Sequence, residues 1–383
     1  MSRPEDRRYQ NLILYVGLLL SVFLTGHCVA AQEGIAGIRV HGPGTPPQLE
    51  FACCEHGLNE MQTLFAQPGV TSLIKSLHAT IAVPTSDFSS QRANVVRSLN
   101  QQGVGVVGWI LLDKEQGPYL SADNVSQAVA RVDAFEKWTG DYGLRWVAVG
   151  LDIEPDFAPL AQLRTHRWRL IGTLLRRSLN FHRMATARKA YSNLIEHIRS
   201  HGYPVQIYQT PYLAAEQSVH SSLLDRLLGT VDSDGDVDYR MLYTSFARPV
   251  GAGMIWSLGP HAQAIAIGST DGDGTPGVAS GPLNWNESSR DLIVASHFTR
   301  QIGIYDLEGC VRQHFLSRLL SFDWNQSVVI PEQSVRRAAL FGFVIRSMLW
   351  IASNLVYLVA AGLLLVGWLL RRRHSGRKSK VDR

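Results

Sequence analysis

The chain has 383 residues, of which 45% are hydrophobic, and a formal net charge of +5. Most of that charge lies at the two ends: residues 1–10 contribute +1 and residues 371–383 contribute +6, which leaves −2 for the region between them. The basic character of the whole chain therefore gives no indication of nucleic-acid binding, and no nucleic-acid partner is expected.

The first 31 residues have the pattern of a secretory signal peptide. A basic start is followed by an apolar run from Leu12 to Leu24 and by small residues suited to cleavage after Ala31. The run is shorter than the roughly 20 apolar residues that a membrane-spanning helix needs. We therefore predict that the following segment is exported, and an uncleaved N-terminal anchor is the alternative.

Strand-like and helical runs alternate between residues 32 and 335, which predicts a parallel sheet built from right-handed βαβ units. The strand-like runs are residues 34–42, 78–84, 103–113, 144–154, 205–211, 239–246, 262–269 and 301–309. Eight units of this kind favour an α/β fold of the (β/α)8 TIM-barrel type. The first run is the least regular, because the Pro- and Gly-rich stretch HGPGTPPQLE overlaps its end and can displace the strand. No glycine-rich phosphate-binding motif follows any run, which argues against a nucleotide-binding sheet.

The connection at residues 157–200 is longer than the others and is predicted to form two helices. Its arginines are Arg164, Arg167, Arg169, Arg176, Arg177, Arg183 and Arg188. A solvated helix face is the expectation for such a segment, and a basic surface lying on anionic lipid is the alternative.

No metal or other cofactor is expected from the sequence. The acidic stretch DSDGDVD, residues 232–238, lacks the glycine and the glutamate that an EF-hand calcium loop requires, so we predict a hydrated turn there. The spacing of Cys53, Cys54 and Cys310 matches no zinc site. One disulfide to Cys310 and plain buried cysteines are both compatible with that spacing.

Residues 347–370 are uncharged and long enough to cross a bilayer. The basic residues 371–383 follow directly, and a basic cluster beside a spanning helix stays in the cytoplasm. We therefore predict a single-pass protein of the cell membrane, with the barrel on the periplasmic or extracellular side. The sequence does not indicate a protein partner.

The fourth strand-like run, 144–154, ends in two carboxylates. Alternate side chains point to opposite faces of a strand, so Val149 and Leu151 share one face while Asp152 and Glu154 share the other. Pro155 ends the strand, which places the acids at its carboxyl end, where parallel α/β folds hold their functional groups. A neighbouring like charge raises the pKa of a carboxyl group, so we expect Glu154 to keep a proton and act as general acid in glycosidic bond cleavage.

Further polar and aromatic side chains are predicted at the same end of the barrel. The carboxylates are Asp113, Glu115, Asp156, Asp271, Asp273, Asp306 and Glu308, and two strand tyrosines are Tyr208 and Tyr243. Flat apolar surfaces on which sugar rings stack are expected from Trp109, Tyr119, Trp256 and Trp285. Asp306 and Tyr208 are predicted to contact the substrate as well.

The segments GLDIEP and MLYTSF resemble two signatures of the family-18 chitinase-like glycoside hydrolases, a D-x-E that ends strand four and an M-x-Y on strand six. The resemblance implies a (β/α)8 barrel that cleaves N-acetylhexosamine polymers with help from the acetamido group of the substrate. It also implies that Glu154 is the general acid, that Asp152 orients the acetamido nitrogen and that Tyr243 is a hydrogen-bond donor to it. Thr244 stands where the family has Asp; without substrate assistance, Glu308 is the expected second carboxylate, as nucleophile or base.

We therefore predict a membrane-anchored, extracytoplasmic glycoside hydrolase-like protein. Its substrate is expected to be a polysaccharide or oligosaccharide, from the envelope or from a secreted polysaccharide. The alternative is a non-catalytic barrel that binds polysaccharide or a partner protein of an export or assembly complex. A lyase or an esterase is a third option, although no G-x-S-x-G motif supports the esterase. Intact acids together with an aromatic cleft favour the enzyme, whereas an arginine paired with Glu154 favours the binding protein.

Overall fold

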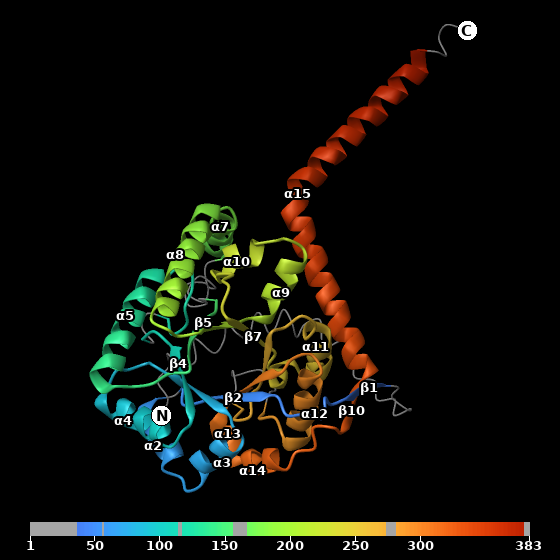
Figure 1. Ribbon diagram of the computed structural model, residues 1–383. Helices are drawn as coiled ribbons and strands as arrows, with labels where there is room; N and C mark the ends of the chain where they lie inside the picture. The colour runs from blue at the N-terminus through green and yellow to red at the C-terminus, as the bar shows by residue number, and fades with distance from the viewer. Residues whose placement is uncertain (1–36, 56, 114–116, 156–166, 273–280, 379–383) are drawn as a thin grey trace.

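The computed structural model describes residues 37–55, 57–113, 117–155, 167–272 and 281–378. In this part of the chain, eight parallel strands form a closed barrel with helices around it, as the sequence predicts (Figure 1). The predicted signal segment 1–31 lies outside the described residues, and so do Glu115, Asp156 and Asp273.

The barrel strands follow one another around the barrel in chain order. They are β2 (Gln48–Ala52), β3 (Thr80–Pro84), β4 (Gly105–Ile110), β5 (Ala148–Ile153), β6 (Val205–Gln209), β7 (Val237–Met241), β8 (Ala264–Gly268) and β9 (Gln301–Tyr305). The barrel closes where β2 pairs in parallel with β9, with Gln48 opposite Gln301.

The predicted position of the first barrel strand is wrong. Residues 37–41 form β1 (Gly37–His41), which pairs antiparallel with β10 (Ser327–Pro331) in a separate two-stranded sheet. The first barrel strand is β2, which begins inside the Pro- and Gly-rich stretch. The physical reason is that alternate side chains of β2, Leu49 and Phe51, are apolar and are buried in the core between barrel and helices.

Helices follow most of the strands and cover the outside of the barrel. They are α2 (Leu58–Phe65), α3 (Val70–Ser76), α4 (Ser90–Gln101), α5 (Val125–Tyr142), α7 (Arg167–Ser178), α8 (Phe181–Ser200), α9 (Pro211–Ser218), α10 (Leu223–Leu228), α11 (Gly251–Leu258), α12 (Trp285–Ser296), α13 (Leu307–Arg312) and α14 (Phe315–Leu320), with a 3-10 turn η3 (Thr244–Ala247).

Strand β5 alternates as the sequence predicts. Val149, Leu151 and Ile153 belong to the large core under the helices, whereas Ala148 packs with Val107 inside the barrel. The bulky face of the strand therefore lies under the helices and its small and acidic face lies inside.

Three of the arginines that the structure describes in the α7–α8 connection are paired with acids and not simply solvated, and Arg164 lies outside the described residues. Arg177 and Arg183 both pair with Asp123 at 3.0 and 2.6 Å, and Arg188 pairs with Asp225 at 3.1 Å. These ion pairs fix the two helices to neighbouring segments of the barrel, because Asp123 precedes α5 and Asp225 lies on α10.

Cys53, Cys54 and Cys310 are buried free thiols, so the disulfide to Cys310 is not formed.

In the acidic stretch 232–238, Asp236 accepts hydrogen bonds from the backbone N–H of Val205 at 2.7 Å and from Arg199 at 3.2 Å. The side chain of Asp236 therefore binds other parts of the protein chain.

One long helix, α15 (Glu332–Lys378), follows β10 and extends away from the barrel (Figure 1). Its first turns pack on α11, where the N–H of Gly253 donates to Oγ of Ser334 at 3.0 Å. Residues Glu332–Leu355 are long and apolar enough to span a membrane, which makes this stretch the one candidate span among the described residues. This stretch overlaps the predicted span 347–370 at residues 347–355, and the helix is already exposed and apolar at Leu340 and Phe343.

Candidate functional site

Asp152 is held inside the barrel at the end of β5, where its side chain is 3% exposed. The indole N–H of Trp109 on β4 donates to Oδ2 of Asp152 at 3.2 Å. Burial, followed by the negative charges of Glu154 and Glu55, raises the pKa of Asp152, and the bond from Trp109 lowers it in part. Trp109 is only 5% exposed, so in this position it contacts the carboxylate and offers little surface to a sugar ring.

Glu154 follows β5 and is half-buried. Its backbone N–H donates to the carbonyl of Leu120 at 3.0 Å, and the N–H of Leu120 donates to the carbonyl of Asp152 at 2.8 Å. This parallel bridge continues the sheet past β5 and fixes Tyr119 beside the acids. Burial, followed by the charge of Glu55, raises the pKa of Glu154 to about 8. Its carboxyl group therefore keeps a proton at neutral pH.

Glu154 has no lysine or arginine partner within the described part of the chain. A cation next to the carboxyl group would favour the ionised form and lower the pKa of Glu154. The pairing that would favour the binding protein, an arginine on Glu154, is absent from the residues that the structure describes.

A third carboxylate, Glu55, follows β2. The hydroxyls of Tyr119 and Tyr305 donate to its Oε1 and Oε2, each at 2.7 Å. The preceding residue, Cys54, has a φ of 65°, in the left-handed region that side-chain-bearing residues seldom adopt. The backbone N–H of Cys54 donates to Oε1 of Glu308, and this bond stabilises the turn that carries Glu55. The sequence analysis missed Glu55 because it misplaced the first barrel strand.

Tyr243 follows β7 and reaches the same group of acids. Its ring stacks on Tyr305, with centroids 5.2 Å apart and planes at 28°. Burial and the negative charges of Asp152, Glu154 and Glu55 raise the pKa of the Tyr243 phenol. The hydroxyl therefore stays protonated beside the carboxylates.

Asp306 and Glu308 have structural partners at the end of β9. Oδ1 of Asp306 accepts the N–H of Gly309 at 2.8 Å and so caps α13. Glu308 accepts the N–H of Cys54, and burial together with the charge of Asp306 raises the pKa of Glu308 to about 8. Both line one small pocket, whose walls are Cys53, Cys54, Glu55, Asp271, Tyr305, Asp306 and Glu308. Of the acids in this pocket, Glu55 is the one whose charge acts on Glu154.

Tyr208 lies opposite Asp152 in the strand register, but its hydroxyl bonds another carboxylate inside the barrel, Glu50. Its hydroxyl donates to Oε1 of Glu50 at 2.8 Å, and Nε2 of Gln206 donates to Oε2 of Glu50 at 3.0 Å. Glu50, which the sequence analysis missed, is 4% exposed, and burial raises its pKa. Tyr208 therefore helps to fill the barrel and to satisfy a buried carboxyl group.

The structure does not bring Trp256 and Trp285 to the carboxylates. Trp256 lies on α11 and stacks on His297, with centroids 5.5 Å apart, and Trp285 begins α12 and packs edge-on against Phe315 at 5.2 Å. The prediction that both lie in loops at the barrel mouth is wrong, because these segments form helices of the outer layer. Of the predicted aromatic residues, Trp109 and Tyr119 do contact the acids.

Comparison with known proteins gives no family, since no family model and no curated protein matches the sequence. Among solved structures, the chain is similar to the glycoside hydrolase domain of PgaB (BpsB) from Bordetella bronchiseptica, with 11% identity and a TM-score of 0.45 over 72% of this chain and 98% of that one. It is also similar to a putative α-L-fucosidase from Bacteroides thetaiotaomicron, with 10% identity and a TM-score of 0.41 over 77% and 99% of the two chains. A xylanase and α-amylase inhibitor protein, XAIP-I, in complex with trehalose has 11% identity and a TM-score of 0.39 over 73% and 100%. Likeness of this degree does not extend to function, and the resemblance to family 18 rests on two motifs.

Proposed function

We propose that this barrel is a glycoside hydrolase in which Glu154 is the general acid. The observation that carries the proposal is the position of Glu154 beside Asp152 and Glu55, half-buried and without a cationic partner in the described chain. Cleavage of a glycosidic bond needs a carboxyl group that is still protonated at the working pH and can donate to the leaving oxygen. Burial and neighbouring negative charge supply that condition.

Two other carboxylates, Asp152 and Glu55, would then act on the sugar ring at the reacting carbon. Asp152, oriented by Trp109, is placed to position an acetamido group or to stabilise positive charge on the reacting carbon. Glu55, held by two tyrosine hydroxyls, replaces Glu308 in the role predicted above, as nucleophile or base when the substrate does not assist. Glu308 is a positioning residue in this scheme, because it bonds the turn before Glu55. Tyr243 supplies a hydroxyl donor.

The substrate class follows from the same site and from the motif resemblance. We propose an envelope or secreted polysaccharide, with N-acetylhexosamine polymers as the first candidates. The binding-protein alternative keeps the same ligand but requires no proton transfer from Glu154.

The test is product release by the full-length protein in detergent from chitin oligomers, peptidoglycan and β- and α-linked glucans. Glu154→Gln keeps the shape of the side chain but removes the acid, so we expect cleavage to fall by roughly 10²- to 10⁴-fold. The matched control is Glu196→Gln, an exposed carboxylate on α8, which leaves cleavage unchanged. If the wild type cleaves none of these polymers, yet it and Glu154→Gln bind one polymer equally well, the binding protein replaces the enzyme.

We also propose that α15 anchors the protein in the cell membrane, with the barrel outside the cytoplasm. Exposed apolar side chains such as Leu340, Phe343 and Met348 lie in the candidate span, and the basic end of the chain follows it. A C-terminal green fluorescent protein fusion should be bright, and protease added from outside should digest the barrel. A dark fusion, or a barrel protected from protease, would contradict this orientation.

A further inference from the structure

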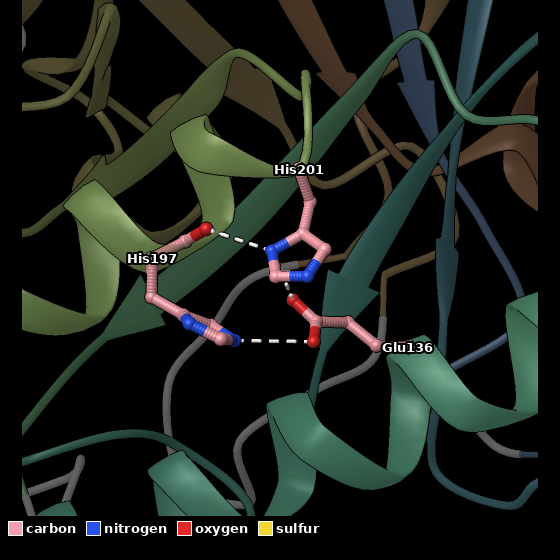
Figure 2. A group of neighbouring side chains, drawn as sticks. All are labelled: Glu136, His197 and His201. Atoms are coloured by element: carbon pink, nitrogen blue, oxygen red, sulfur yellow. Dashed lines mark hydrogen bonds and ion pairs between the residues drawn. The ribbon is translucent and has the colours of Figure 1, made fainter.

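Two histidines and one glutamate meet on the outer helical layer, away from the carboxylates of the barrel mouth. Glu136 lies on α5, His197 lies on the last turns of α8, and His201 is the residue that ends α8 (Figure 2). One ligand atom from each of the three lies within 4.8 Å of the other two. Two imidazoles and a carboxylate form one of the ligand sets that hold Zn²⁺ in proteins.

The spacing of the donor atoms already suits a metal ion. Nε2 of His197 lies 3.1 Å from Oε2 of Glu136, and Nδ1 of His201 lies 3.4 Å from Oε1 of Glu136. Two ligands at roughly 2.0–2.1 Å from a tetrahedral Zn²⁺ lie about 3.4 Å from each other. Only small side-chain rotations are therefore needed to close the three ligands on one ion.

A buried polar atom at this cluster lacks a hydrogen bond, although Nδ1 of His201 lies 3.4 Å from it. Oε1 of Glu136 is buried and accepts no hydrogen bond among the described residues. A buried carboxylate oxygen left without a donor is costly, and a bound cation removes that cost. The glutamate side chain as a whole is 20% exposed, whereas the side chains of His197 and His201 are 42% and 47% exposed, which leaves room for a water ligand.

The ring of His201 is oriented by the protein chain. Its Nδ1 lies 3.0 Å from the carbonyl oxygen of His197, one turn earlier on α8. Because Nδ1 is also the nitrogen that lies 3.4 Å from Oε1 of Glu136, an ion bound between these two atoms would replace the hydrogen bond to the carbonyl. The spacing of His197 and His201, four residues apart, puts both rings on one side of the helix, as Figure 2 shows.

We propose that Glu136, His197 and His201 form a structural site for a divalent transition-metal ion, with Zn²⁺ as the ion of choice. The ion would join α5 to α8, and α8 is the second helix of the longest connection in the barrel. The site contacts neither Glu154 nor Asp152, so its role is to stabilise the outer layer and not to take part in glycosidic bond cleavage.

The experiment uses the full-length protein in detergent, stripped with EDTA and titrated with ZnCl2. Bound metal is measured by equilibrium dialysis and elemental analysis, and the unfolding temperature is recorded with and without ZnCl2. The variants are Glu136→Gln, His197→Ala and His201→Ala. The matched control is His182→Ala, which removes an exposed imidazole from the same helix.

We expect the wild type and His182→Ala to take up one Zn²⁺ per chain and to unfold at a temperature a few degrees higher with ZnCl2. Each site variant should weaken binding by about tenfold or more and lose most of that rise. The zinc-dependent change, taken within each variant, separates metal binding from any general loss of stability. Absence of stoichiometric uptake by the wild type, or equal uptake by the three site variants and the control, would overturn the proposal.

Discussion

The hydroxyl of Tyr305 donates to Oε2 of Glu55 at 2.7 Å, and this bond joins the last barrel strand to the first. Tyr119, from the segment after β4, donates to the other oxygen of the same carboxylate. Glu55 thus connects the segments that follow β2, β4 and β9. Burial raises the pKa of Glu154 most, and the negative charge of Glu55 raises it further.

Removal of the Tyr305 hydroxyl tests this connection. Tyr305→Phe takes one of two donors from a partly buried carboxylate, so we expect the free energy of unfolding to fall by about 1–3 kcal/mol. Urea denaturation measures the change. In a double-mutant cycle, Tyr305→Phe should cost much less in a Glu55→Gln background. Tyr142→Phe on α5 is the control; a loss no larger than in that control would show that the bond is not stabilising.

Replacement of Trp109 by Phe should raise the pKa of Asp152 further. The indole N–H is the one contact that favours the charged form of this carboxyl group, while burial and the neighbouring acids oppose it. Carboxyl ¹³C NMR of the protein follows the titration. Trp146→Phe, which removes an indole bond of 2.9 Å to Thr139, leaves the acids alone and should not move that titration. An unchanged or lowered pKa of Asp152 would contradict the assignment.

The pKa of Glu154 makes a prediction about stability and pH. Its pKa in the folded protein is about 8 and its ordinary value is 4.5, so between these values the folded state binds more protons than the unfolded state. Stability supplied by Glu154 is therefore present below about pH 4.5 and is lost as the pH rises through 8. Glu154→Gln removes this dependence, so relative to the wild type the variant should become more stable as the pH rises from 5 to 8.5.

Urea denaturation at several pH values measures that difference. Glu196→Gln provides the comparison, because Glu196 is exposed on α8 and its replacement should give a nearly constant difference across this range. A Glu154→Gln variant whose difference from the wild type is also constant would mean that Glu154 is ionised throughout.

The absence of a side chain at Gly150 makes room for the ring of Tyr208 inside the barrel. A Cβ at position 150 would lie 2.7 Å from Cε2 of the Tyr208 ring, closer than packed atoms tolerate. We expect Gly150→Ala to lower the free energy of unfolding by about 1–3 kcal/mol. Gly140→Ala is the matched control: nothing lies within 4 Å of its new Cβ, so on helix α5 it should stabilise by roughly 0.5–1 kcal/mol. Equal effects of the two changes would show that Tyr208 is free to move.

The sequence by itself determined the barrel and which side chains of its fourth strand, β5, face inward and outward. Alternating bulky and small side chains are a local property, so the inward position of Asp152 and the outward position of Leu151 follow from the pattern alone. The apolar C-terminal helix follows from composition in the same way. These features need no knowledge of which segments meet.

Only the tertiary structure decided which groups meet at the barrel mouth. Glu55 looked like an ordinary loop residue because β1, not β2, has the stronger strand pattern, yet closure of β2 on β9 brings it to Tyr305. The tryptophans on α11 and α12 were assigned to the mouth because their spacing does not distinguish a loop from a short helix. Glu136 and His197 are 61 residues apart, and their meeting depends on how α5 and α8 pack against the same barrel. Long-range pairing of this kind is set by closure of the sheet and by the helical layer, which no local pattern records.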